Sequence, residues 1–197
     1  MDLTLDAAST ALVMIDLQKG IARGTAPHAA DDVVARAATI AAALRAAGGT
    51  VIWVRVENAA DGADRLKPVT DSGRGGGGPK AADHSELAPR LGVLAGDVVV
   101  TKRGWGAFYG TDLDLQLRRR GIGTIILGGI STNIGVESTA REAYDHAYQQ
   151  VFVEDAMACR SAAEHAVTVE TILPRIGRVR STAQILEALS ANGAGPE

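Results

Sequence analysis

The chain has 197 residues, of which 46% are hydrophobic and 22% charged, and its formal net charge is -3. This length predicts one domain, residues 1–197, with enough chain to bury a full core. The small negative charge gives no electrostatic basis for binding nucleic acid or an anionic membrane, and no apolar stretch approaches the roughly 20 residues of a membrane span. The first residues do not resemble a signal peptide, so we expect a cytoplasmic protein.

Apolar, β-branched runs alternate with segments of helical spacing along most of the chain. In chain order, these patterns predict a strand at 10–15, a helix at 31–47, strands at 50–56 and 97–101, a helix at 112–120, a strand at 124–127, a helix with its N-cap at 131, 132 or 133, a strand at 150–153, a helix at 161–173, a strand at 178–180 and a helix at 181–189. Such alternation favours a parallel sheet covered by helices on both faces.

Residues 58–95 interrupt this rhythm, because they show no clean periodicity. Gly73, Gly75 and Gly78 formally fit a GxGxxG pattern, but no strand runs directly into them and Pro79 follows where a helix should begin. The pattern of a phosphate-binding loop is also missing. We therefore expect a mobile, Gly-rich surface loop that acts as a lid near a site, and not a nucleotide-binding motif.

Three candidate functional groups lie at the ends of three different predicted strands. Asp16 follows the first strand, Lys102 follows the third, and a turn at residues 131–135 follows the fourth. Each has an ordinary structural explanation, as a turn cap, a solvated strand end or tight glycine packing. However, a doubly wound parallel sheet gathers the carboxyl ends of its strands at one edge, where ligands bind. Backbone N–H groups in such a turn can also hold an anion.

Together with residues 105–113, these groups resemble the isochorismatase-like hydrolase superfamily, also called the cysteine hydrolases. The matching stretches are 12–18, 101–103, 107–113, 128–143 and 153–156. The resemblance implies a three-layer α/β/α, Rossmann-like fold with a six-stranded parallel sheet in the order 3-2-1-4-5-6. It also implies a non-proline cis peptide at Ile130–Ser131, a homo-oligomer that is a dimer or larger, and an Asp–Lys–Cys catalytic set in the members that hydrolyse amides.

The sequence departs from the amide-hydrolysing members at the nucleophile, where it has Gly135. The catalytic set carried over by the resemblance is therefore Asp16, Lys102 and Gly135, and the backbone turn that would hold an oxyanion comprises Ile130, Ser131 and Gly135. Without a thiol at this position no acyl-enzyme can form. The only cysteine, Cys159, lies beyond the fifth strand, and we expect it to be a buried packing thiol.

True isochorismatases also carry glycine at the nucleophile position and hydrolyse a vinyl ether. The resemblance therefore implies that Asp16 acts as a general acid on a small, carboxylated substrate, with Lys102 holding the substrate carboxylate or orienting Asp16. Those enzymes carry histidine where this chain has Asn133, so the turn combines features of both branches. Two alternatives remain open: a catalytically silent protein that binds small molecules, and a decayed amidase on the same scaffold.

Further residues are predicted to surround the substrate, although core packing explains the aromatic ones equally well. They are Gln18, Trp105, Phe108, Tyr109 and Asn133. Arg55 and Glu57 end the second strand, where they would meet the substrate or each other. The four histidines form no pair at helical spacing, and the Asp-x-His run of zinc-binding nicotinamidase-type relatives is absent after Val56. We therefore expect no metal and no cofactor.

Overall fold

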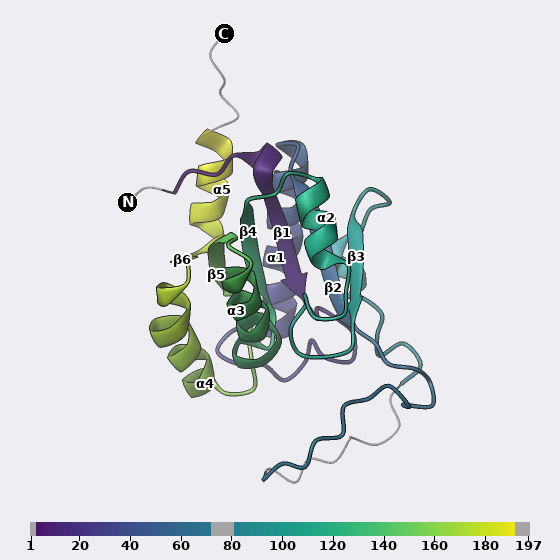
Figure 1. Ribbon diagram of the computed structural model, residues 1–197. Coiled ribbons are helices and arrows are strands. Elements are labelled where there is room, and N and C mark those ends of the chain that lie inside the picture. Colours follow the sequence, from purple (N-terminus) through teal and green to yellow (C-terminus); the bar gives the residue numbers. More distant parts are fainter. Residues whose placement is uncertain (1–2, 72–80, 192–197) are drawn as a thin grey trace.

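A computed structural model describes residues 3–71 and 81–191 of the chain (Figure 1). Its principal elements are β1 (Thr10–Ile15), α1 (Ala30–Ala46), β2 (Thr50–Val56), β3 (Val98–Lys102), α2 (Leu113–Arg119), β4 (Thr124–Ile130), α3 (Glu137–Asp145), β5 (Gln149–Ala158), α4 (Ala162–Val167), β6 (Arg178–Arg180) and α5 (Thr182–Ala191). The six strands are parallel and lie in the order β3-β2-β1-β4-β5-β6. The predicted fold class and strand order are confirmed.

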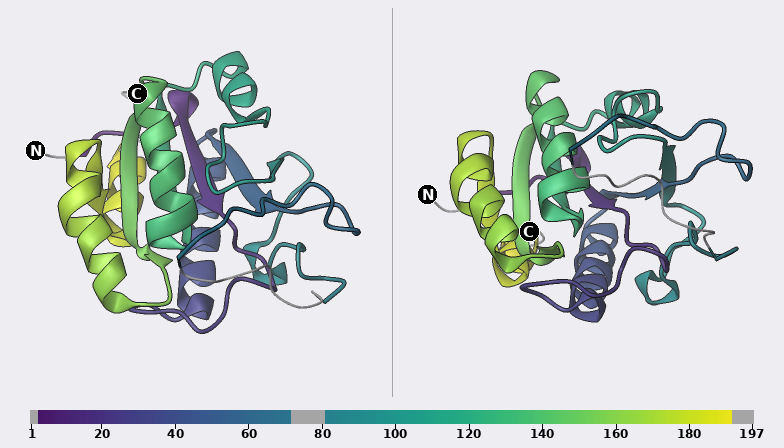
Figure 2. Two further views of the ribbon diagram at one scale, coloured as in Figure 1. Left: turned by 60° about the horizontal axis from the view of Figure 1, so that its bottom comes forward. Right: turned by 90° about the horizontal axis from the view of Figure 1, so that it is seen from below.

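Helices cover both faces of the sheet, which forms the middle of three layers (Figure 2). Residues of α1 and α5 build one apolar cluster with one face of the strands, and residues of α2 and α3 build a second cluster on the other face. The central strand β1 is buried at all six positions. A strand buried on both faces gains from apolar residues at every position, which is why its sequence shows no polar alternation.

The largest differences from the predicted elements are in β4 and β5, which both run past their predicted ends. β4 continues to Ile130 through two glycines, which break the β-branched pattern. Gly129 has a φ of 120°, and a side chain there would collide with the backbone of Ile15. Glycine is therefore required for β4 to pass close to β1. This close approach places the turn after β4 beside the end of β1.

Two predicted helices begin or end differently because they contain irregular turns. The segment Thr132–Val136 is a π-helical turn, so α3 starts only at Glu137. After α4, the chain continues through a second π turn, Thr168–Ile172, instead of one regular helix. Such turns often occur at functional sites.

The connection from β2 to β3 leaves the carboxyl edge of the sheet as a long excursion (Figure 1). Within its described residues, the only helix or strand is the short helical turn Pro89–Leu91. The Gly-rich run at 73–78, predicted to be mobile, lies outside the described residues. An isolated β-bridge between Gln18 and Leu87 ties the returning part of the excursion to the end of β1. Among all the described residues, no helix is both long and apolar enough to cross a membrane.

Candidate active site

The fold brings Asp16, Lys102 and Gly135 together at the carboxyl edge of the sheet. Asp16 follows β1, Lys102 ends β3, and Gly135 lies in the turn after β4. The Lys102 Nζ atom lies 2.9 Å from Asp16 Oδ2. A Cβ atom added to Gly135 would lie 3.3 Å from the same carboxylate oxygen. Three groups far apart in the sequence therefore face one small volume.

The position of Asp16 is fixed by the backbone directly after β1. Its φ is 52°, in the left-handed region, which aspartate tolerates better than most residues. Its backbone N–H donates to Val54 O at 2.9 Å. The residue is 6% exposed, and its Oδ1 atom is buried without a hydrogen-bond partner in the described part of the chain. A buried, unpartnered carboxylate oxygen is costly, and such groups are often found where a protein binds or reacts with a ligand.

Burial raises the pKa of Asp16 from the ordinary 3.8 to about 6, although the charge of Lys102 and its hydrogen bond act in the opposite direction. Desolvation of the carboxylate thus outweighs its ion pair. At pH 7 roughly one Asp16 side chain in ten is protonated. Lys102 is 2% exposed and also donates to Gly104 O at 3.0 Å. The pair therefore combines a carboxyl group whose pKa is close to neutral pH with a buried ammonium group.

A cavity of about 370 Å³ opens beside this pair. It is lined by Asp16, Ile21, Val56, Asn58, Arg65, Leu66, Lys102, Arg103, Gly104, Trp105, Ile130, Ser131, Ile134 and Gly135. Three of the lining residues are basic and one is acidic. Arg103 is paired with Asp64 at 2.8 Å, whereas Arg65 forms no ion pair with any described residue. The cavity has the size and charge for a small anionic molecule.

The backbone turn that lines one side of the cavity is closed by its own hydrogen bonds. The peptide bond between Ile130 and Ser131 is cis. Ser131 O accepts bonds from the N–H groups of Ile134 and Val136, both at 3.1 Å. The hydroxyl of Thr139 in α3 donates to Gly135 O at 2.7 Å. The turn is thus held against α3 with Gly135 facing Asp16.

The structure places the other predicted site residues in different environments. Trp105 lines the cavity. Gln18 is fully buried, and its amide exchanges two hydrogen bonds with the backbone of Val56, at 3.0 and 2.7 Å. Phe108 packs in the core, stacked on His146. Tyr109 is 87% exposed and is not among the lining residues.

Asn133 and Cys159 lie on the side of the turn that faces α4. The Asn133 amide donates to Glu164 Oε2 at 3.0 Å. Cys159 is buried, its thiol donates to Ser161 O at 3.0 Å, and burial raises its pKa. A thiol with a raised pKa and no place in the cavity lining is a poor nucleophile.

Several residues near the site could not be found by sequence reasoning. Asn58, Arg65 and Leu66 reach the cavity from the aperiodic β2–β3 connection, which gives no pattern to assign them. Arg55 and Glu57, which the sequence did single out, meet each other, with Arg55 Nη2 3.0 Å from Glu57 Oε2. At the opposite side of the turn, His28, Glu154 and His165 form a compact cluster. No sequence pattern joins these three residues, because they come from the connection before α1, from β5 and from α4.

The chain is thus a doubly wound α/β/α protein with a buried acid–lysine pair and a cavity at the carboxyl edge of its sheet, the edge where ligands bind in this class of fold. The chain belongs to the isochorismatase family, since residues 10–184 match the Isochorismatase domain.

Similar proteins support this assignment along nearly the whole chain. YwoC of Bacillus subtilis, an uncharacterized isochorismatase family protein, is 53% identical over 186 residues, which cover 94% of this chain and 96% of that protein. A solved structure of an isochorismatase family protein from Burkholderia thailandensis is 47% identical, with a TM-score of 0.91, covering 96% of this chain and 100% of that chain. Ureidoacrylate amidohydrolase RutB of Methylorubrum extorquens is 33% identical over 177 residues, which cover 77% of this chain and 70% of that protein.

Proposed function

We propose that this isochorismatase-family hydrolase cleaves a small carboxylated substrate without a covalent thioester intermediate, with Asp16 as the general acid. The observation that carries the proposal is the pairing of Gly135 with a buried, partly protonated Asp16. A Cβ atom at Gly135 would lie only 2.9 Å from Ile15 Cγ2, so the packing around the turn is fitted to glycine. With no side chain at this position, water must be the attacking group.

The reaction that fits these groups is hydrolysis of a vinyl ether such as isochorismate. Protonated Asp16 gives its proton to the terminal carbon of the double bond, and the ether oxygen stabilises the resulting oxocarbenium ion. Water adds to that ion, and the hemiketal then breaks its C–O bond to give an alcohol and a keto acid. The proton lost by the water restores Asp16. Since Oδ2 is bound to Lys102 and Oδ1 has no partner among the described residues, Oδ1 is the better site for the transferred proton.

The basic residues of the cavity support a substrate that carries a carboxylate. An ammonium group has three N–H donors, and Lys102 uses two of them on Asp16 and Gly104. The third has no partner among the described residues and can bind the substrate. Arg65 lines the same cavity without an ion pair to a described residue and offers a planar, bidentate partner for a carboxylate. A bound substrate carboxylate would also oppose ionisation of Asp16 and so favour its acid form.

The direct test is a hydrolysis assay with isochorismate as the probe, in which released pyruvate is coupled to NADH oxidation. The proposal predicts turnover by the wild-type chain and its loss in Asp16→Asn. A panel of other small carboxylated vinyl ethers extends the test if isochorismate fits the cavity poorly. Full turnover by Asp16→Asn would contradict the mechanism. If no compound of the panel is cleaved but these acids raise the melting temperature, the chain is a binding protein.

A second assay addresses amide hydrolysis, which the name of the relative RutB suggests as an alternative. Ureidoacrylate serves as the probe, and Gly135→Cys is compared with Gly135→Ala, which adds the same Cβ atom without the thiol. The proposal predicts no amide hydrolysis by the wild type. Amide hydrolysis gained only by Gly135→Cys, in a chain that leaves every vinyl ether intact, would instead identify a decayed amidase.

A further inference from the structure

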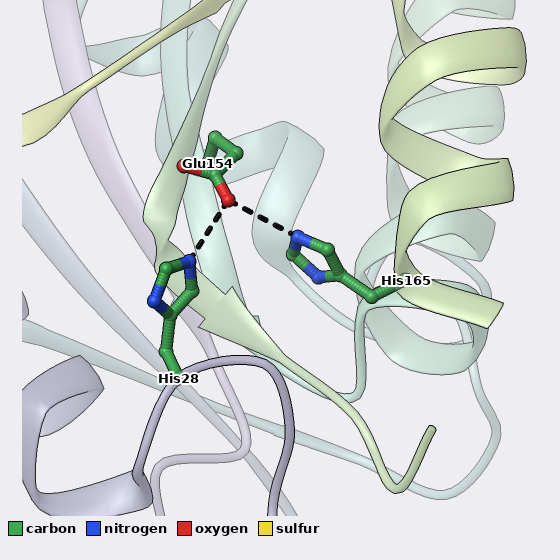
Figure 3. Close-up of side chains that lie close together, drawn as sticks. All are labelled: His28, Glu154 and His165. Carbon is green, nitrogen blue, oxygen red and sulfur yellow. Dashed lines mark hydrogen bonds and ion pairs between the residues drawn. The ribbon is translucent and has the colours of Figure 1, made fainter. Parts of the chain in front are cut away.

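Outside the cavity, three side chains that commonly bind metals converge on one point (Figure 3). Glu154 Oε1 lies 2.8 Å from His28 Nε2 and 3.3 Å from His165 Nε2. One ligand atom from each residue lies within 4.8 Å of the other two. The residues come from the connection before α1, from β5 and from α4, so only the tertiary fold joins them. None of the three lines the cavity.

The backbone segment that carries each of these three residues is fixed by its own contacts. The chain before His28 is tied to the end of β5 by two backbone hydrogen bonds between Ala26 and Cys159, of 2.7 and 2.9 Å. Glu154 lies where the pairing of β4 with β5 shifts register. His165 belongs to α4, whose first turn is capped by the hydroxyl of Ser161. The ligand atoms are thus brought together by fixed backbone elements.

We propose that His28, Glu154 and His165 bind a first-row divalent metal ion of the Zn²⁺ type. Two imidazole nitrogens and a carboxylate oxygen are a donor set that zinc and neighbouring metals use in proteins. Ligands about 2.0–2.2 Å from a tetrahedral ion lie roughly 3.3–3.6 Å apart. Glu154 Oε1 lies 2.8 and 3.3 Å from the two imidazole nitrogens, and all three ligand atoms lie within 4.8 Å of one another, so shifts of about 1 Å or less would meet that geometry.

The solvent exposure of the three side chains and the hydrogen bond between His165 and Thr132 also suit a metal site. The side chain of His165 is 5% exposed, whereas those of His28 and Glu154 are 23% and 35% exposed, so an ion can enter from solvent and keep water in its remaining positions. Thr132 Oγ1 lies 2.9 Å from His165 Nδ1. When His165 Nδ1–H donates this hydrogen bond to Thr132 Oγ1, the ring is oriented and Nε2 is left unprotonated to bind the ion.

The Thr132 contact gives the ion a structural role, because Thr132 begins the turn that carries Gly135. A metal bound to His165 would brace this turn from the side opposite the cavity. The inference differs from the sequence-based expectation of no metal, which rested on spacing within one helix or one short run. It is independent of the proposed reaction.

The test is isothermal titration calorimetry of the EDTA-dialysed full-length chain with ZnCl₂. We expect one ion per chain with a dissociation constant in the micromolar range or tighter, and no comparable binding of MgCl₂, which prefers oxygen ligands. His28→Ala and Glu154→Gln should each weaken Zn²⁺ binding by at least about tenfold, and Thr132→Val by roughly tenfold through loss of the outer hydrogen bond. The control His146→Ala removes an exposed histidine outside the cluster and should leave binding unchanged.

Two further measurements do not depend on any variant folding normally. Co²⁺ added to the wild-type chain should give visible absorption bands of a nitrogen- and oxygen-bound ion, and anomalous X-ray scattering at the zinc edge should place the ion between the three side chains. Absence of saturable Zn²⁺ binding would overturn the proposal, in which case Glu154 serves only as a hydrogen-bond acceptor for two imidazoles. An ion found at other residues, or an affinity unchanged in both His28→Ala and Glu154→Gln, would overturn it equally.

Discussion

Two carboxylates with little exposed side-chain surface, at opposite edges of the sheet, have pKa values shifted in opposite directions. Asp97 precedes β3 at the amino edge, and its side chain is 4% exposed. Burial alone would raise its pKa, but hydrogen bonds from Arg45, Leu94 N and Trp53, together with the Arg45 charge, lower it below the ordinary value. At the carboxyl edge, Asp16 lies deeper in the protein, with the whole residue 6% exposed, and is paired with one lysine; its pKa is raised to about 6.

Besides its shallower burial, Asp97 has more hydrogen-bond donors than Asp16. Arg45 approaches Asp97 through two nitrogens at 2.9 and 2.6 Å, and Trp53 Nε1 and Leu94 N add bonds of 2.8 and 2.9 Å. Asp16 has Lys102 on one oxygen and no partner in the described structure for the other. A fully bonded carboxylate stabilises the fold, whereas an incompletely bonded one keeps a proton available near neutral pH.

The largest expected effect comes from removing the acid itself. Asp16→Asn should lower kcat/KM for isochorismate by about 100-fold to 10 000-fold, because general acid catalysis typically contributes this much. Asp97→Asn is the matched control: it makes the same chemical change at the other edge, and the activity of each folded molecule should remain unchanged. Equal losses in the two variants would contradict a catalytic role for Asp16.

The next effect is on stability and is tested at the amino edge. Asp97→Asn should lower the free energy of unfolding by about 1–3 kcal/mol, because Arg45 loses its charged partner in a partly buried site. Urea denaturation measures this loss. Since the pKa of Asp97 is lowered, its contribution is complete above about pH 4 and disappears as the pH falls further, so the difference between wild type and Asp97→Asn should shrink in acid.

The pH dependence of turnover tests the raised pKa of Asp16. The reactive Asp16 is protonated, so kcat/KM should be constant well below pH 6 and fall about tenfold per pH unit above it. The raised pKa also means that the folded chain binds a proton between about pH 4 and pH 6 that the unfolded chain does not, so ionisation of Asp16 reduces stability across that range. A rate that rises through pH 6 would show that Asp16 acts as a base.

The smallest effect tests substrate recognition. Arg65→Gln should raise KM for isochorismate by roughly fivefold with little change in kcat, because a partly exposed arginine contributes about 1 kcal/mol to holding a carboxylate. Arg103→Gln is the control, since Arg103 lines the same cavity but is already paired with Asp64. If both variants bind the substrate as well as the wild type, the carboxylate must be held by Lys102 alone.

Much of the fold follows from local sequence patterns. The six predicted strand segments correspond to the six strands, and Gly48 and Gly121 lie just past the ends of α1 and α2. The lengths of β4 and β5 were underestimated, because Gly128 and Gly129 interrupt one run and Glu154 and Asp155 interrupt the other. The two glycines allow β4 to pass close to β1, and Glu154 and Asp155 lie where the pairing of β4 with β5 shifts register. Both features depend on contacts between strands, which the sequence of one strand does not show.

The sequence by itself determined the strand order through family resemblance, the three strand ends that face one another, and the absence of a thiol at Gly135. A residue type and its place after a strand are local properties, so they are readable without coordinates. Only the tertiary structure decided the raised pKa of Asp16, the entry of Arg65 into the cavity and the meeting of His28 with Glu154 and His165. Each depends on burial or on contacts between distant segments, which no pattern within one segment encodes.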